Sequence, residues 1–163
     1  MPQLVKKGQL IQDDWLRLER LEDDESLPSG KLLVPVSVWL ARRGELVERE
    51  QLGVWLDSDE EPACISDDLR HFELVAINFP AFADGRGYSY ARLLRERHNY
   101  PGELRAIGDV LIDQLYYLKR CGFDAFALRS DQNLQLALAS LALFSESYQA
   151  AIDQPIPLFR RRQ

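Results

Sequence analysis

Short apolar runs alternate with helix-like segments from residue 52 onward, and this alternation constrains the fold more than any other feature of the sequence. Four runs have the composition of buried strands: 52–56 (LGVWL), 74–79 (LVAINF), 104–107 (LRAI) and 125–128 (AFAL). The segments between them carry apolar residues at helical spacing, as at Leu111, Leu115 and Leu118. Strands and helices that alternate at this spacing predict βαβ units and a mostly parallel sheet.

The four runs are apolar at nearly every position, which is typical of strands that are covered on both sides. We therefore expect an α/β fold with helices on both faces of the sheet. The sequence leaves open whether the sheet is open or barrel-like. The length of 163 residues suits a single domain, which we divide into an N-terminal part (1–50), a βαβ core (51–149) and a tail (150–163).

Four further elements are predicted outside this alternating pattern. Leu4–Val5 and Gln9–Ile11 could form short edge strands on either side of a turn. A helix is expected over 35–48, because proline suits the first turn of a helix. Asp131 is the expected N-cap of the last helix.

Composition argues against several classes of protein. No apolar run approaches the roughly 18 residues that cross a bilayer, and the first ten residues lack the apolar part of a signal peptide, so we expect a cytoplasmic protein without a membrane partner. The net charge of −6 argues against a nucleic-acid binder. Cys64, Cys121 and two histidines are too few for a disulfide framework, an iron–sulfur cluster or a common zinc pattern. We expect buried free thiols, no metal and no cofactor.

The carboxyl ends of the predicted strands are the expected place for a site, because open parallel sheets bind ligands there. Residues 84–89 (DGRGYS) follow the second strand, Asp109 follows the third and Arg129 follows the fourth. Parallel strands would bring all of these residues to one edge of the sheet.

The turn 84–87 (DGRG) is the most informative of these segments. Two glycines flank Arg86 just before a helix predicted over 88–97, so backbone N–H groups and a guanidinium could bind an anion. Alternatively, Asp84 caps the helix and Arg86 pairs with a neighbouring acid, and Asp109 is equally either an N-cap or a working carboxylate. The candidate binding residues are Asp84, Gly85, Arg86, Gly87, Tyr88, Ser89, Arg92, Asp109 and Arg129.

The segment 79–129, which contains the DGRGYS and RCGFDAF runs, closely resembles a family of uncharacterised bacterial proteins. The likeness continues more loosely to residues 144–149, and the upstream residues resemble the more variable N-terminal half of the family. The resemblance implies genes that lie beside the sulfite reductase hemoprotein and a label of oxidoreductase in sulfite reduction. It places the family's motif on residues 84–89 and the following helix on Arg92 and Arg95.

Two hypotheses follow. Sulfite reduction needs redox centres that this chain has too few cysteines to hold, so we expect an accessory protein of sulfate and sulfite assimilation. Its partner would be sulfite reductase or another sulfate-assimilation enzyme, or a small anion bound at the DGRG turn. Residues 57–68 carry six acids and no base and could form a surface that faces the partner. The alternative is an enzyme that acts on a small anionic substrate with Asp84, Asp109 and Arg129 at the strand ends.

Overall fold

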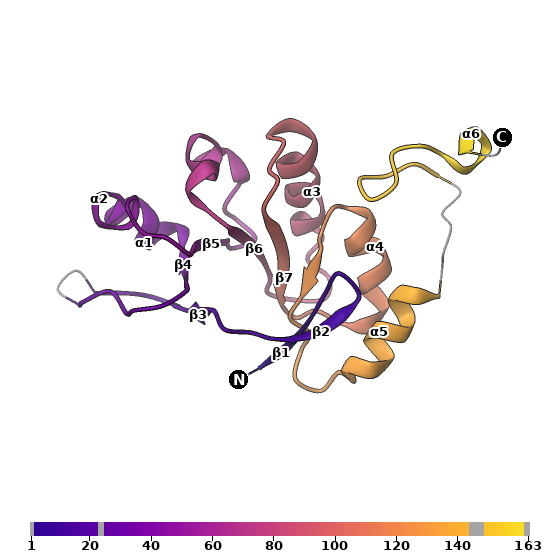
Figure 1. Cartoon of the computed structure of the whole chain (residues 1–163), viewed down its shortest axis with the longest axis horizontal. Helices are drawn as coiled ribbons and strands as arrows, with labels where there is room; N and C mark the ends of the chain where they lie inside the picture. Colours follow the sequence, from indigo (N-terminus) through magenta and orange to yellow (C-terminus); the bar gives the residue numbers. More distant parts are fainter. Residues whose placement is uncertain (1, 23–24, 144–148, 162–163) are drawn as a thin grey trace.

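An eight-stranded sheet forms the centre of the molecule in the computed structural model, which describes residues 2–22, 25–143 and 149–161 (Figure 1). Its strands lie in the order β2-β1-β8-β7-β6-β5-β4-β3. They are β1 (Gln3–Lys6), β2 (Gln9–Gln12), β3 (Leu16–Arg17), β4 (Leu32–Pro35), β5 (Leu52–Leu56), β6 (Leu74–Phe79), β7 (Glu103–Gly108) and β8 (Ala125–Phe126). The four strands predicted between residues 52 and 128 are therefore present.

The sheet is mixed. Strands β3 to β8 are parallel and each pairs with the next along the chain, as expected for βαβ units. Strand β1 runs antiparallel to β8, and β2 runs antiparallel to β1. The sheet curls into a half-barrel (Figure 1). Of the two arrangements that the sequence left open, an open sheet and a barrel-like one, the structure has the barrel-like one.

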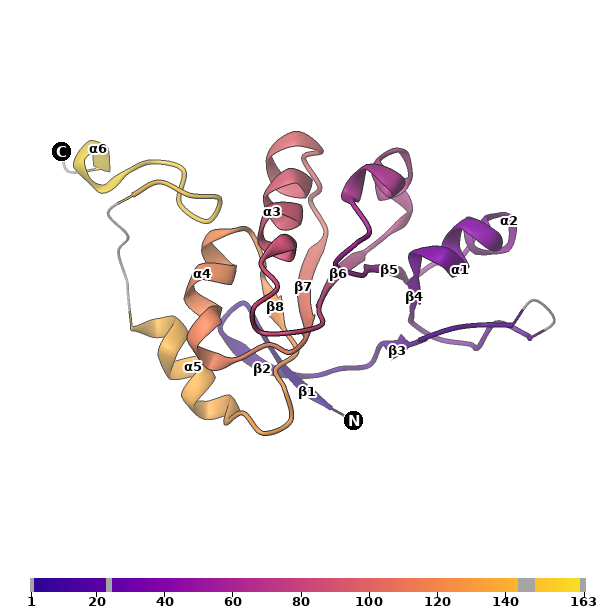
Figure 2. The same ribbon diagram turned by 180° about the vertical axis from the view of Figure 1, so that it is seen from behind.

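The helical segments lie on the convex side of this curled sheet (Figures 1 and 2). They are α1 (Val36–Ala41), α2 (Arg43–Leu46), η1 (Pro62–His71), α3 (Arg86–Arg92), η2 (Leu93–Arg97), η3 (Ile112–Gln114), α4 (Leu115–Arg120) and α5 (Leu134–Ala142), and a short α6 (Leu158–Arg161) follows in the tail. The prediction of helices on both faces is wrong. Because the chain visits β3 to β8 in spatial order, every right-handed crossover falls on the same side of the sheet.

The apolar residues of the strands divide between two unequal clusters. The larger one packs the sheet against the helices and includes Val54, Ile77 and Ala106. The smaller one lines the concave side with Leu33, Trp55, Leu74, Ala76 and Ile107. Trp15 packs on this smaller cluster. The strands are thus apolar on both sides, but a connecting segment covers the second side where we expected a helix.

The N-terminal hairpin confirms the predicted edge strands. Its two-residue turn, Lys7-Gly8, has φ values of 48° and 76°, and positive φ at both positions is the requirement of a type I′ turn between twisted strands. Strand β2 lies at one end of the strand order and β3 at the other, yet only residues 13–15 separate them. Because four residue steps span at most about 14 Å, this short link holds the two edges of the sheet close together.

The helix predicted over 35–48 is present as two short helices, α1 and α2. Pro35 ends β4 opposite Trp55 and is the N-cap residue of α1, so the helix begins one residue later than predicted. The predicted N-cap of the last helix, Asp131, is wrong. The N-cap of α5 is Asn133, whose side chain accepts hydrogen bonds from the N–H groups of Gln135 and Leu136. Within the described residues, no helix is long and apolar enough to span a membrane.

Candidate functional site

The loops that follow β5, β6, β7 and β8 meet at one edge of the half-barrel, as the sequence predicted for parallel strands. In the loop after β6, Asp84 and Arg86 form a two-pronged ion pair. Nη2 and Nε of Arg86 donate to the carboxylate of Asp84 at 2.7 and 3.0 Å. The same carboxylate accepts the backbone N–H of Arg86 at 3.2 Å. The guanidinium holds the pKa of Asp84 well below its usual range.

Ser58 ties this ion pair to the loop after β5. Its hydroxyl accepts a hydrogen bond from Nη2 of Arg86 at 2.9 Å, and its carbonyl oxygen accepts the hydroxyl of Tyr90 at 2.8 Å. Beside it, the amide of Asn78 donates to Asp57 at 3.0 Å. The DGRG segment is therefore held in place by a contact with the loop after β5.

Asp109 and Arg129 form a second ion pair farther along the same edge. Nη1 of Arg129 donates to Asp109 at 2.6 Å, and its Nε and Nη2 donate to Asp131 at 2.7 and 2.8 Å. Arg129 lowers the pKa of Asp131 to about 2. The other oxygen of Asp109 accepts the backbone N–H of Phe82 at 2.8 Å. Asp109 is therefore not the predicted helix cap, since its side chain is used to fix the loop after β6.

The remaining predicted residues of the DGRGYS run begin helix α3, pack against β6 or lie on the surface. Helix α3 begins at Arg86, two residues earlier than predicted, and Gly85 is its N-cap residue. Gly87 is buried against β6, where an added Cβ would lie 2.6 Å from the ring of Phe79. Tyr88 packs edge-on against Phe79 and also contacts Tyr117, and burial raises its pKa. Ser89 is exposed.

The last predicted residue, Arg92, also lies on the surface. It makes a long ion pair of 3.7 Å with Glu96, one turn along the helix. Contacts of this kind are typical of a solvated helix face.

The charged groups at this edge are paired with one another. The carboxylate of Asp84 occupies the N–H of Arg86, where an anion was predicted to bind, and all three nitrogens of the Arg129 guanidinium donate to carboxylates. The side chain of Phe82, by contrast, is 57% exposed on a loop whose backbone Asp109 holds. The edge therefore presents an aromatic side chain on a fixed loop between two locally neutralised ion pairs.

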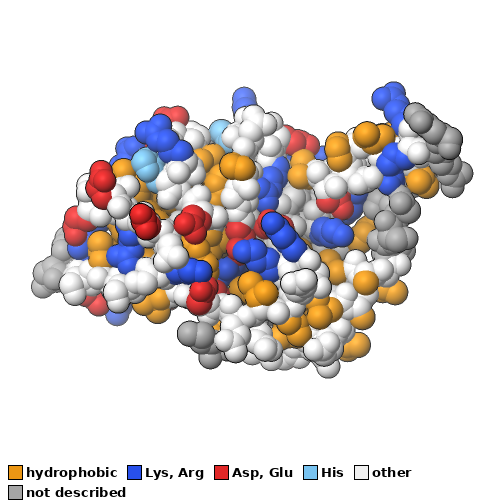
Figure 3. All heavy atoms as spheres, viewed as in Figure 1, with side chains coloured by type: hydrophobic (Ala, Val, Ile, Leu, Met, Phe, Trp, Pro, Cys, Tyr) orange, Lys and Arg blue, Asp and Glu red, His pale blue; other side chains and the backbone are white. Residues whose placement is uncertain are grey.

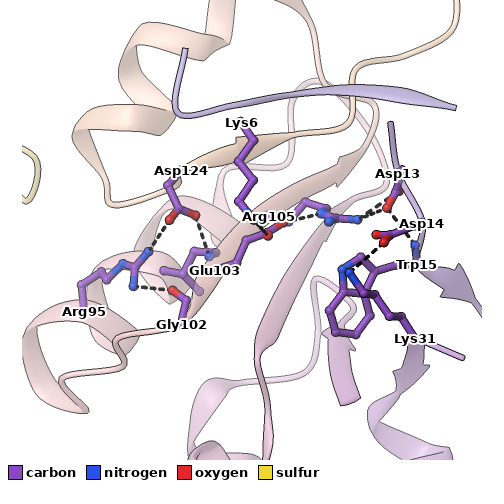
Figure 4. Close-up of polar contacts among 11 residues, drawn as sticks. Lys6, Asp13, Asp14, Trp15, Lys31, Arg95, Gly102, Glu103, Arg105 and Asp124 are labelled. Carbon is purple, nitrogen blue, oxygen red and sulfur yellow. Dashed lines mark hydrogen bonds and ion pairs between the residues drawn. The ribbon is translucent and has the colours of Figure 1, made fainter. Parts of the chain in front are cut away.

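A polar network at the opposite end of the concave face was not predicted (Figure 4). Arg105, on β7, is 2% exposed; its Nε donates to Glu103 at 2.7 Å and its Nη1 to both oxygens of Asp13 at 2.9 and 3.0 Å. Lys6 completes the network with a contact of 2.5 Å to Glu103. Alternation along β7 could have placed Arg105 on the concave side with Glu103, but nothing in the sequence indicates Asp13 as a partner.

Cysteines and possible metal ligands were also predicted from the sequence. Cys121 is buried as expected, but Cys64 is exposed on η1, so the prediction of two buried thiols is wrong for Cys64. Among the residues that the structure describes, no three His, Cys, Asp or Glu side chains are grouped so that they could hold a metal ion.

Residues 53–159 match the model of a family described as "bacterial protein of unknown function (DUF934)", and the chain belongs to this family. The match covers the strands from β5 to β8 and the loops of the edge described above. No curated protein and no solved structure matches the chain.

Proposed function

We propose that this protein is a non-catalytic accessory protein that docks a protein partner through the edge of the half-barrel that carries Phe82. We call this surface the docking edge; it consists of Phe82, Asp84, Arg86, Asp109, Arg129 and Asp131. The observation that carries the proposal is the exposure of Phe82 on a loop whose backbone is fixed by Asp109. An aromatic side chain in such a position can enter a pocket of a partner with little loss of conformational entropy.

The pairing of charges favours docking over catalysis. A general acid or base needs a pKa near the working pH, whereas Arg86 and Arg129 lower the pKa values of Asp84 and Asp131. Binding of a small anion to Arg129 would first have to displace two carboxylates. Ion pairs of this kind suit the rim of an interface, where they set orientation and exclude wrong partners.

The resemblance of residues 79–129 to proteins encoded beside sulfite reductase supports the choice of partner. We propose that the partner is the sulfite reductase hemoprotein or another enzyme of sulfate assimilation in the cytoplasm. The redox step belongs to the cofactors of that enzyme, and this chain would contribute its docking edge.

Binding of the purified sulfite reductase hemoprotein to the immobilised protein tests the proposal. We expect Phe82→Ala to weaken binding about 30-fold, the typical effect of losing a central aromatic anchor. Leu40→Ala is the matched control, because Leu40 lies on α1 and is 56% exposed. It should bind like the wild type. Equal binding by Phe82→Ala and the wild type would refute the docking edge.

Growth of a strain that lacks the gene tests the biological role. We expect growth on sulfide but not on sulfate or sulfite, with rescue by the wild type and by Leu40→Ala but not by Phe82→Ala. Normal growth of the deletion strain on all three sulfur sources would contradict a role in sulfite reduction. Binding of the hemoprotein without a growth defect would support the docking edge but contradict the claim that growth on sulfite requires it.

A further inference from the structure

A cavity of about 500 Å³ lies at the opposite edge of the sheet from the docking edge, near the start of β8. Its walls come from α4, α5, the turn of the N-terminal hairpin and the tail. Phe123, Phe126, Leu138 and Leu141 form most of the apolar lining, and Lys7 and Lys119 also line it. We call it the α4–α5 cavity. Its size falls within the range of sites that bind small molecules.

The acids that line the α4–α5 cavity are already neutralised. Asp153 pairs with Arg120 at 2.6 Å. Asp124 lies 3.6 Å from Arg95 and accepts the backbone N–H of Leu104 at 2.9 Å. Within the described part of the chain, neither Lys7 nor Lys119 lies within ion-pair distance of an acid. The cavity therefore combines an apolar interior with two lysines that form no close ion pair, although Lys7 lies near enough to Asp124 to act on its charge.

The wall of the α4–α5 cavity is held in a fixed shape. Arg95 donates to the carbonyl oxygens of Gly122, Tyr100 and Gly102 at 2.7 to 3.0 Å, which ties η2 to the chain segments beside it. Figure 3 shows hydrophobic side chains gathered over α5 and positively charged side chains beside them over α4. Asp124 and Asp153 pair with arginines, so the charges of the lining that form no close ion pair are positive. An apolar site of this kind is suited to an amphipathic ligand of the opposite sign.

We propose that the α4–α5 cavity binds an amphipathic carboxylate, with its apolar body against Phe123, Phe126 and Leu138 and its carboxylate between Lys7 and Lys119. The ligand is thus an organic acid with an apolar chain or ring. This site shares no residue with the docking edge, so the two proposals stand or fall separately.

Calorimetric titration of the full chain with decanoate tests the site. We expect decanoate to bind at one site, while decyltrimethylammonium, which has the same chain and a positive charge, does not bind. Leu138→Trp, which fills the cavity, should weaken binding more than tenfold. Leu136→Trp is its matched control, because Leu136 lies on the same helix but is 60% exposed outside the cavity. It should leave the affinity unchanged.

A second variant tests the charges without changing the packing. Lys7→Gln combined with Lys119→Met should weaken decanoate binding about tenfold, since each exposed contact contributes modestly. Arg97→Met removes one positive charge from an exposed position outside the cavity and should have no effect. The proposal is overturned if decanoate does not bind, if the cation binds as well, or if Leu138→Trp and the double lysine variant both keep the affinity of the wild type.

Discussion

Arg105 joins three distant parts of the chain through one buried side chain. Its guanidinium contacts Glu103 on β7 and Asp13 in the link between β2 and β3, and Lys6 on β1 reaches the same Glu103. The two acids are 8% and 16% exposed at their side chains. Removal of Arg105 would leave Asp13 without this partner and Glu103 with Lys6 alone, in a poorly solvated place.

Replacement of Arg105 by methionine should therefore destabilise the protein by about 3 kcal/mol, the usual cost of breaking a buried ion pair from one side. Urea unfolding followed by circular dichroism measures this change. Arg92→Met is the control, because Arg92 makes only an exposed contact with Glu96, and it should change stability by less than about 0.5 kcal/mol. A change below about 1 kcal/mol for Arg105→Met would contradict the structural role of the network.

The two cysteines should differ in their reaction with iodoacetamide. Burial raises the pKa values of both thiols, and Glu60 and Glu61 raise that of Cys64 further. A raised pKa lowers the thiolate fraction at a given pH, so Cys64 should react more slowly than a free cysteine. The midpoint of its curve of reaction rate against pH should lie at a higher pH than that of a free cysteine. Cys121 should react only after unfolding. Mass spectrometry of the alkylated protein would detect the opposite result, equal rates for both thiols in the folded protein.

Among the elements, α3 shows why the DGRG run has its sequence. The helix starts against β6, and Gly87 packs directly against the side chains of Phe79 and Ile77 on that strand. Gly85, two residues earlier, has open space around it, with no side-chain atom nearer than 4.0 Å to an added Cβ. The two glycines of the motif therefore have different roles.

This difference predicts opposite outcomes for two alanine substitutions. Gly87→Ala should destabilise the protein by about 2 kcal/mol, because the new methyl group would force Phe79 or the helix to move. Gly85→Ala should stay within about 0.5 kcal/mol of the wild type. Thermal unfolding of the two variants side by side checks the prediction, and an equal loss in both would indicate that backbone freedom, and not packing, selects these glycines.

The elements also show how far the sequence could predict the structure. Strands β5 and β6 were predicted with their observed bounds, because continuous apolar runs between turn residues are a strong local signal. The helix predicted from Pro35 begins at Val36 and is divided into α1 and α2, because Pro35 still belongs to β4. At the site, one alternative predicted that Arg86 pairs with a neighbouring acid and that Asp84 caps the helix. The acid is Asp84 itself, and the N-cap residue is Gly85.

The contacts that the sequence could not predict are those made between distant segments. Asp13 and Arg105 are 92 residues apart, and Asp109 reaches the backbone of Phe82 across 27 residues. Neither contact follows from local spacing or from a motif. Both depend on the curl of the sheet, which brings loops and edges together only when all strands are in place.

For the whole molecule, the concave side of the half-barrel is closed by a segment of three residues. Trp15 lies on the small cluster formed by Leu33, Trp55 and Leu74 among others, in the position that a second layer of helices would occupy in a doubly covered sheet. Trp15 therefore covers part of this side of the sheet together with Ala127, and it should contribute to the stability of β5 and β6.

Trp15→Ala should destabilise the protein by about 2 kcal/mol, less than for a fully buried tryptophan because Trp15 is only partly buried. Hydrogen exchange should become faster at the backbone amides of β5 and β6, which lie beneath it. Leu16→Ala, at the neighbouring position that is 47% exposed, should change neither quantity appreciably. Unchanged exchange in Trp15→Ala would mean that the link does not protect the concave face.

The pairing of β1 with β8 also imposes an order on the assembly of the sheet during synthesis. A ribosome makes the chain from its N-terminus, so Val5 emerges about 120 residues before Phe126, opposite which it lies in the sheet. Strands β3 to β7 can assemble as they appear, because each pairs with the strand made just before it. The hairpin must wait until β8 has formed. Residues 3–6 are therefore made long before β8 but can pair with it only after it has been made.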